Sequence, residues 1–504
     1  MSVTNIAAIL KSLSRKERKL MDFETIIGLE VHAQLLTRSK MFCRCSADYP
    51  STPPNTHVCP VCLGMPGVLP VINRKAVEYT ILMALALNCT ISEHTKFDRK
   101  NYPYPDLMKG YQISQYDAPF GHHGWLTIEG DGDRKKIDIT RVHLEEDVAK
   151  LLHRTEPDGE TYSLMDVNRS GVPLMEVVGE PDLRSPEEAR QYLIKLRSIL
   201  QYTGVSTGNM EEGSFRCDAN ISIRPEGSSE LLAKVEIKNM NSFKAVYLAL
   251  EYEARRQRKA VAEGKRPVQE TRGWVEAKGK TVSQRSKEYA HDYRYFPEPD
   301  LPPLVINREW VEEIKAKLPE MPEARRDRFM AEYGLPIYDA NLLTMSKAMA
   351  DYFEDCQKVN DKVSPKEASN WLLGEVSRIM NANNIDIDDF EKRVSAINLS
   401  GLIFSSQHAI NAATAKSVLE EMFKTSTDSG EIIARQGLGQ ISDTPEIENT
   451  VAEVINSNPK PLADFNAGKE TALKFLIGQV MKATKGRANP ALVNEVLKKK
   501  LTEG

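Results

Sequence analysis

Several segments in the first half of the chain alternate between apolar and polar residues. Successive side chains of a β-strand point to opposite faces of the sheet, so alternation separates the two kinds of residue. In residues 25–35 one face carries Ile27, Leu29, Val31, Ala33 and Leu35, and the other carries Ile26, Gly28, Glu30, His32 and Gln34. Segments 137–147, 214–224 and 235–238 alternate in the same way. The pattern predicts an antiparallel sheet with one buried face and one open polar face.

Three segments of the same half are predicted as helices that cover the apolar face: 74–88, 185–204 and 242–264. The second begins with Ser185, Pro186 and Glu188, which supply a cap, a proline in the first helical turn and a capping-box acid. The segment around Gly279 indicates a hairpin turn between two further strands.

From Phe296 the pattern of residues changes, because four prolines from 297 to 303 indicate an extended crossing segment. Almost everything after Trp310 has helical periodicity, as in 323–333 and 344–357. We therefore predict an α+β protein in four parts. These are a disordered basic leader over 1–22, a sheet-based cradle over 23–295, a helical linker domain over 296–362 and a helical tail over 363–504.

Composition narrows the class of protein. The 504 residues are 41% hydrophobic and 27% charged, with a net charge of -4, which excludes a uniformly basic nucleic-acid coat and a highly charged disordered chain. No stretch reaches 18 apolar residues, so we predict no membrane span. In residues 1–20 the basic residues follow the apolar segment, the wrong order for a secretory signal. We expect a bacterial cytoplasmic protein, or an organellar one if residues 1–20 act as a presequence.

Charge is uneven at the far end of the chain. Residues 469–504 hold eight Lys or Arg and three acids, a local net charge of +5. This excess indicates either contact with phosphates or a solvated helical face.

Four of the seven cysteines lie within twenty residues, as Cys43, Cys45, Cys59 and Cys62. Two such pairs supply the thiolates that a tetrahedral zinc ion needs, and four thiolates leave no open position. We therefore predict a structural zinc knuckle over 43–62, with reduced thiols or a redox pair as the alternative. Cys89, Cys217 and Cys356 are isolated beside apolar residues and are predicted to be core residues.

Acids and histidines gather on the predicted polar faces. Glu30 precedes His32, and Glu145 and Glu146 follow a histidine on another strand. Glu211 and Glu212 stand just before the strand over 214–224. Oxygen ligands drawn from several strands suit magnesium with nucleotide phosphates, although each acid taken alone is explained as well by a surface salt bridge.

Basic residues could complete such a phosphoryl-transfer site. Arg141, Arg216 and Lys238 lie on the same polar faces and could neutralise phosphate charge. Arg99 and Lys100 belong to residues 96–106, where basic and aromatic residues interleave. That segment could bind a nucleotide or a nucleic-acid end, or it could be a proline-stiffened structural loop.

Seven segments together resemble the GatB family, whose members each form one component of a tRNA-dependent amidotransferase. They are residues 23–32, 96–106, 111–115, 143–147, 210–214, 292–299 and 478–482. The resemblance runs in order from about residue 23 to the C-terminus. It implies a cradle that resembles the glutamine synthetase catalytic fold, and a tail domain, shared with the YqeY proteins, that holds tRNA.

The resemblance also implies a reaction and partners. A GatB-type subunit uses ATP and magnesium to phosphorylate the side-chain carboxylate of Glu-tRNA(Gln) or Asp-tRNA(Asn). Ammonia from a partner GatA-type amidase then displaces the phosphate, and a small GatC-type subunit connects the two. The alternative for this chain is a zinc-stabilised tRNA-binding scaffold that has lost catalysis.

Carried onto this sequence, the resemblance makes Glu30, His32, Glu145 and Glu211 the candidate magnesium ligands. Strand alternation favours Glu145 over Glu146, since Glu145 shares a face with His143. Glu146 and Glu212 stay as alternatives. Structural zinc at the four cysteines is implied by the family as well as by their spacing.

Overall fold

The computed structural model describes residues 22–129, 134–286, 293–439, 444–466, 469–484, 487–488 and 490–503. The predicted leader lies outside these residues except for Asp22. Within the described part of the chain, no helix is long and apolar enough to cross a membrane. The chain divides into two compact units, Met1–Pro322 and Glu323–Gly504.

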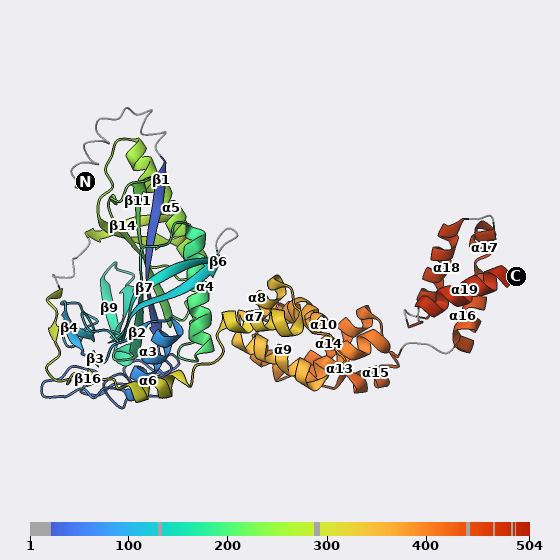
Figure 1. The fold of residues 1–504 in the computed structure, drawn as a ribbon, viewed down its shortest axis with the longest axis horizontal. Coiled ribbons are helices and arrows are strands. Elements are labelled where there is room, and N and C mark those ends of the chain that lie inside the picture. The colour runs from blue at the N-terminus through green and yellow to red at the C-terminus, as the bar shows by residue number, and fades with distance from the viewer. Residues whose placement is uncertain are drawn as a thin grey trace. The chain divides into compact units, whose positions relative to one another are not determined.

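A nine-stranded sheet forms the centre of the first unit (Figure 1). Its strands lie in the order β14-β13-β12-β11-β1-β10-β7-β6-β2. Their bounds are β1 Phe23–Gln34, β2 Thr90–Ile91, β6 Gly121–Glu129, β7 Arg134–Glu146, β10 Pro173–Gly179, β11 Phe215–Pro225, β12 Val235–Lys238, β13 Glu270–Val275 and β14 Lys280–Ser286. The four segments predicted from alternation are thus strands β1, β7, β11 and β12.

The sheet is mixed, which corrects the prediction of a purely antiparallel one. Strands β12 and β13 pair in parallel, while the other neighbours pair antiparallel. Parallel neighbours need a long crossover, and helix α5 (Phe243–Ala262) supplies it between these two strands. The predicted hairpin follows as β13 and β14, joined through the 3-10 turn Glu276–Lys278 and Gly279 at φ 54°.

Three helices supply the predicted cover of the apolar face. They are α3 (Arg74–Ala86), α4 (Pro186–Tyr202) and α5. The hydroxyl of Ser185 accepts a hydrogen bond from the Glu188 amide, and Ser242 caps α5 in the same way. Apolar residues of these helices share one core with the inward residues of β1 and β11, including Leu29, Val31 and Ile221.

Small sheets edge the polar face of the large one. Strands β4 and β5 pair with β15 in one of them, β3 pairs with β16, and β8 pairs with β9. The Gln115 side chain accepts a hydrogen bond from the Leu144 amide, which ties the end of β5 to β7. The bounds are β3 His94–Thr95, β4 Asp98–Asn101, β5 Tyr111–Ser114, β8 Lys150–Thr155, β9 Thr161–Asp166, β15 Phe296–Pro297 and β16 Leu304–Val305, with a 3-10 turn at Val167–Arg169 and helix α6 at Arg308–Lys315.

The second unit is helical, as predicted. Its described helices are α7 Pro322–Tyr333, α8 Ile337–Thr344, α9 Lys347–Val359, α10 Pro365–Trp371, α11 Ser377–Asn383, α12 Ile387–Glu391, α13 Ala396–His408, α14 Ala412–Thr425, α15 Ser429–Gln436, α16 Thr444–Ser457, α17 Pro459–Asn466, α18 Glu470–Ala483 and α19 Pro490–Glu503, with a π-helical segment at Leu372–Val376. One core runs from Phe329 to Ile432 through Val363, and a separate core joins residues of α16 to α19. The predicted boundaries at 296 and 363 stay predictions.

Candidate functional site

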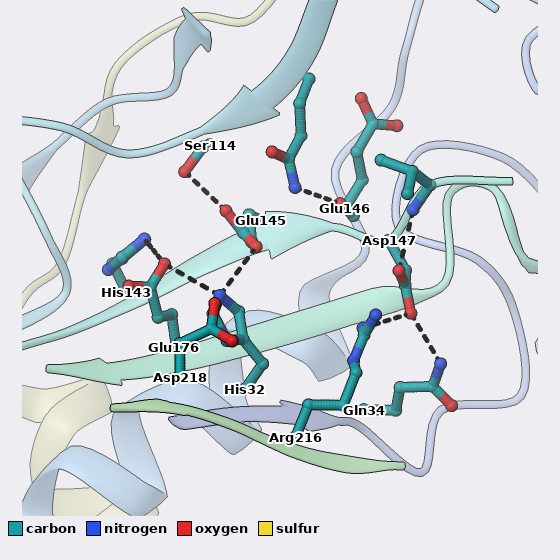
Figure 2. Close-up of polar contacts among 12 residues, drawn as sticks. His32, Gln34, Ser114, His143, Glu145, Glu146, Asp147, Glu176, Arg216 and Asp218 are labelled. Carbon is teal, nitrogen blue, oxygen red and sulfur yellow. Dashed lines mark hydrogen bonds and ion pairs between the residues drawn. The ribbon is translucent and has the colours of Figure 1, made fainter. Parts of the chain in front are cut away.

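Three adjacent strands bring a row of ionisable side chains together on the polar face. Strand pairing sets His32 of β1 opposite Glu176 of β10, and Glu176 opposite His143 of β7. Arg216 of β11 lies opposite His32 on the other side. Residues paired directly across strands share a face, so the register alone places these side chains next to one another. Figure 2 shows His32, His143, Glu145 and Glu176 converging.

Glu176 is the centre of this group. Its Oε2 lies 3.4 Å from His32 Nε2 and 3.1 Å from His143 Nε2. The Oε1 atom of Glu145 lies 3.7 Å from the same His32 nitrogen, and its other oxygen accepts a hydrogen bond of 3.1 Å from Ser114. One ligand atom each from His32, Glu145 and Glu176 lie within 4.8 Å of one another. One imidazole nitrogen and two carboxylate oxygens could therefore hold a cation.

The charges of this group are strongly coupled to one another. Burial disfavours a charged His32, but the carboxylates of Glu176 and Glu145 outweigh it and raise the pKa of His32 to about 9. Burial likewise disfavours a charged Glu176, but His143 and His32 hold its pKa well below the usual value. The row is thus organised around the ionised carboxylate of Glu176, whose charge a bound cation could neutralise in place of the imidazole proton.

A cavity of about 320 Å³ opens in front of the row. Its wall carries the basic residues Lys100, Arg141, Lys234 and Lys238. The Nε atom of Arg141 is buried and has no hydrogen-bond partner among the residues that the structure describes. A buried polar group without a partner is costly, so an anion in the cavity would satisfy it.

Acidic and aromatic residues complete the wall. Glu30 lines the cavity and accepts a hydrogen bond of 2.7 Å from Asn220. Asp218 lies 2.5 Å from the Lys238 ammonium group. The remaining side includes Tyr116, Tyr293 and Tyr295. The cavity therefore offers both carboxylates for a cation and ammonium or guanidinium groups for an anion.

Other predicted residues lie outside this cavity. Glu146 points to the opposite side from Glu145 (Figure 2), where it pairs with Lys109 and accepts a bond of 2.9 Å from the Ile113 amide. Glu211 and Glu212 are exposed on a turn before β11. The roles assigned to these three acids stay predictions that the arrangement of the cavity does not favour.

Two predicted phosphate ligands are engaged elsewhere. Arg216 donates to Asp147 Oδ2 at 2.7 Å, and Arg99 makes two hydrogen bonds of 2.6 and 2.8 Å to Glu298. Burial opposes ionisation of Asp147, but the charges of Arg216 and Arg169 lower its pKa. Arg141, Lys100 and Lys238 are the predicted basic residues that do line the cavity.

Sequence reasoning missed Glu176, Asp218, Lys234, Tyr293 and Tyr295. Glu176 is the one acid in the apolar run of β10, and its only signal was that charge within the run Pro173–Gly179. Asp218 stood on the recognised polar face of β11 without being singled out.

The four knuckle cysteines lie together, as their spacing predicted. Cys62 Sγ lies 3.6 Å from Cys43 Sγ and 3.7 Å from Cys59 Sγ, and one sulfur from each of the four lies within 4.8 Å of the others. A tetrahedral zinc with bonds of about 2.3 Å would set its sulfur ligands about 3.8 Å apart. The cluster is therefore compatible with a structural zinc ion.

The surroundings of the cluster favour a thiolate at Cys62, whereas the hydrogen bond to Cys62 together with burial raises the pKa of Cys43, and burial raises the pKa of Cys45. A hydrogen bond from Cys43, together with the charge of Lys40, lowers the pKa of Cys62 to about 4. The Lys40 ammonium group is buried and lies 3.6 Å from Cys62 Sγ. Cys89, Cys217 and Cys356 are buried in the apolar cores, as predicted.

Two family descriptions match the chain. The GatB/GatE catalytic domain matches residues 25–312, and the GatB domain matches residues 351–501. The chain belongs to the GatB/GatE family. The resemblance drawn from the sequence motifs is thereby confirmed.

Full-length relatives are named as the corresponding component of the aspartyl/glutamyl-tRNA(Asn/Gln) amidotransferase. The chain is 60% identical to the one from Dehalococcoides mccartyi, covering 96% of this chain and 100% of the relative. Those from Carboxydothermus hydrogenoformans and Thermomicrobium roseum are 54% and 55% identical, over 96% of this chain and 100% and 99% of theirs. The GatB catalytic match includes every residue of the cavity and of the cysteine cluster.

Proposed function

We propose that this chain is the subunit of a tRNA-dependent amidotransferase that activates the side-chain carboxylate of a misacylated tRNA. The substrate is Glu-tRNA(Gln), Asp-tRNA(Asn) or both. A carboxylate oxygen attacks the γ-phosphorus of ATP and ADP leaves. Ammonia then attacks the acyl carbon, inorganic phosphate leaves and the nitrogen loses a proton to give the amide. The observation that carries this proposal is the row His32–Glu145–Glu176, whose ligand atoms lie close enough together to hold a cation, beside a cavity lined by basic residues.

The chain's own residues would orient the substrates and neutralise the charge of the phosphate groups. Arg141, Lys100 and Lys238 bind the phosphate oxygens, and the buried, unpaired Nε of Arg141 gives the strongest reason to expect an anion. A free carboxylate is a poor acylating agent, so an acyl phosphate supplies the leaving group and the protein needs no nucleophile. Bound substrate would have to fill the cavity to keep water from hydrolysing that intermediate.

Magnesium fits the donor set of the row. His32, Glu145 and Glu176 would hold it, and Glu30, which lines the same cavity, is a further candidate ligand. When bound, magnesium would neutralise the negative charge that develops on the transferred phosphoryl group. The predicted likeness of the cradle to glutamine synthetase accords with this use of a polar sheet face and stays part of the proposal.

Structural zinc at the four cysteines is part of the proposal as well. The ion would hold the loop over 43–62 together. Backbone hydrogen bonds from Lys40 to Cys45 and from Met41 to Gly171 connect this loop to the rest of the first unit. A closed set of four thiolates has no position for a substrate. The zinc would therefore support the fold near the site without taking part in the reaction.

The remaining parts concern partners and location. We propose a GatA-type amidase and a small GatC-type subunit as partners, and the bacterial cytoplasm as the location. The separate core of α16 to α19 would hold tRNA through the basic excess of residues 469–504, because phosphate contacts position a nucleic acid without reading its bases. Deleting residues 444–504 leaves the core from Phe329 to Ile432 intact, and should weaken tRNA affinity while leaving ATP affinity within about twofold.

One assay tests the central proposal. The complex of this chain with its two partner subunits is incubated with ATP, glutamine and either Glu-tRNA(Gln) or uncharged tRNA. We expect ADP release only with the charged tRNA, and loss of that release in Arg141→Met. Arg190→Met, which alters an exposed guanidinium on α4, is the control and should not change ADP release. Absence of ADP release would favour the scaffold alternative, and ADP release independent of charged tRNA would refute activation of the tRNA-bound carboxylate by this chain.

A further inference from the structure

Arg99 and Lys100 are neighbours on β4, and a strand sends neighbouring side chains to opposite faces. Lys100 lines the cavity, so Arg99 faces away from it. Sequence reasoning assigned both residues to phosphate binding. The structure separates them, and the surroundings of Arg99 show what it does contact.

Two carboxylates and an aromatic ring contact the guanidinium of Arg99. Its Nε and Nη2 donate to the two oxygens of Glu298 at 2.6 and 2.8 Å, and Nη2 lies 3.2 Å from Asp300. The Glu298 side chain is fully buried. The guanidinium also lies over the Tyr111 ring, with its carbon 4.3 Å from the ring centroid. A two-point fork of this kind fixes orientation as well as distance.

Glu298 ends a segment that forms one wall of the cavity. Strand β15 pairs with β4, which sets Phe296 opposite Arg99, and the Glu298 amide donates to the Phe97 carbonyl at 2.9 Å. Just before β15 stand Tyr293 and Tyr295, both of which line the cavity. The bond pair between Arg99 and Glu298 therefore anchors residues 293–298 just after the two tyrosines.

Of the two tyrosines, Tyr293 contacts Lys100 and Tyr295 contacts another residue of the cavity wall. Tyr295 stacks on Tyr116 with ring centroids 4.4 Å apart and planes 14° apart. The Lys100 ammonium group lies 5.2 Å from the centroid of the Tyr293 ring, close enough for a cation–π contact. A shift of the segment would thus move two walls of the cavity and the environment of one phosphate-binding lysine.

We propose that Arg99 is a positioning residue, which holds Tyr293, Tyr295 and Lys100 in place for a nucleoside triphosphate through its fork to Glu298. The nature of the ligand rests on the proposed function, but the positioning itself rests on the contacts above. Arg99 is not among the residues that line the cavity. Its loss acts only through the wall that it fastens.

The test uses Arg99→Lys, Glu298→Gln and the double variant, each in complex with the partner subunits. Arg99→Lys keeps the charge and removes the fork, and Glu298→Gln keeps the shape and removes the charge. The control is Arg190→Lys, which breaks a comparable fork to Glu187 on α4. Two quantities are measured, namely the KM for ATP in ADP release and the hydrogen exchange of amides in residues 293–301.

If Arg99 positions the wall, both single variants raise the KM for ATP by about tenfold, and the double variant by no more than about twofold beyond either, since both remove one interaction. In all three variants the amide hydrogens of residues 293–301 exchange faster than in the parent, whereas Arg190→Lys changes neither the KM nor the exchange. A KM raised by Arg99→Lys and unchanged by Glu298→Gln would overturn the proposal, because it would mean direct contact with phosphate. Unchanged exchange in the variants would overturn it as well.

The two proposals can fail separately. Absence of ATP-dependent ADP release in the parent complex would refute the proposed function, while exchange in 293–301 would still decide the positioning role. Thermal melting followed by circular dichroism checks folding, because Glu298 is buried. If Glu298→Gln does not fold, Arg99→Lys decides the question through exchange, where slow exchange equal to the parent's refutes the fork.

Discussion

Two clusters in the first unit can each hold a cation, and they are built in opposite ways. The cysteine cluster takes all its ligands from a single loop of twenty residues and packs against the apolar Ala149 and Val167. The row of His32, Glu145 and Glu176 takes its ligands from three strands and opens onto a cavity. Soft thiolates in a closed set suit a structural ion, and two carboxylates with an imidazole beside a cavity suit an ion that contacts a substrate.

The difference separates two effects that one substitution could confuse. Damage to the closed cluster should appear first in stability, because metal binding is coupled to folding there. A substitution in the open row should first lower the turnover number. Single substitutions can therefore show to which kind of site a residue belongs.

Glu176→Gln should produce the largest effect. It removes the central carboxylate of the row, so ADP release that depends on charged tRNA should fall by about a hundred- to a thousandfold. The zinc content should stay at the parent value, because the candidate ligands of that ion are the four cysteines. The measurement pairs steady-state ADP release with metal analysis.

The matched control for this change is Glu187→Gln, an exposed acid on α4. It should leave both quantities unchanged. Turnover of Glu176→Gln within about threefold of the parent would remove Glu176 from the proposed magnesium site.

Cys59→Ser should have the next largest effect, on stability. It removes one of four sulfur ligands, so zinc content should drop below one equivalent and the free energy of unfolding should fall by about 3 kcal/mol. Chemical denaturation and metal analysis measure both. Cys217→Ala, a buried cysteine of β11 outside the cluster, should keep the zinc. One full equivalent of zinc in Cys59→Ser would refute the site.

The same contrast explains what the sequence could predict. The cysteine cluster was predictable in full, because its ligands are close in sequence and their type and spacing define the geometry. Two of the three residues of the open row were predictable, because alternation identified His32 and Glu145 as members of a polar face. Glu176 was missed because its strand is apolar on both sides and its partners come from pairing across strands, which composition does not encode.

The fold shows the same difference between elements that neighbouring residues determine and pairings that depend on distant parts of the chain. Capped helices such as α4 and the alternating strands β1 and β11 are fixed by neighbouring residues, and the predictions for them are confirmed. The parallel pair β12 and β13 was not predicted, since it depends on how α5 returns the chain to the sheet. The separation of Arg99 from Lys100 was not predicted, because residues 96–106 were interpreted as either a nucleotide-binding segment or a proline-stiffened loop, and strand β4 within them was not recognised.

Glu145→Gln and Glu146→Gln should have smaller effects that differ in kind. Glu145 faces His32, so its change should lower turnover by about 10- to 100-fold and leave stability nearly unchanged, since Ser114 can still donate to the amide oxygen. Glu146 is buried against Lys109, so its change should lower the free energy of unfolding by about 2 kcal/mol. The opposite pattern, stability lost in Glu145→Gln and turnover lost in Glu146→Gln, would exchange their roles.

Glu211→Gln should have the smallest effect on the metal site, although the sequence made Glu211 a candidate ligand. Its side chain lies on an exposed turn whose amide at Glu211 is held by the Asn209 side chain at 3.0 Å, outside the cavity wall. We expect the magnesium concentration for half-maximal ADP release to change by less than about twofold, whereas Glu145→Gln should raise it by about tenfold or more. A rise in Glu211→Gln equal to that in Glu145→Gln would mean that the turn reaches the ion in the working enzyme. The open row would then include a ligand from a loop, and the contrast with the cysteine cluster would rest on ligand chemistry alone.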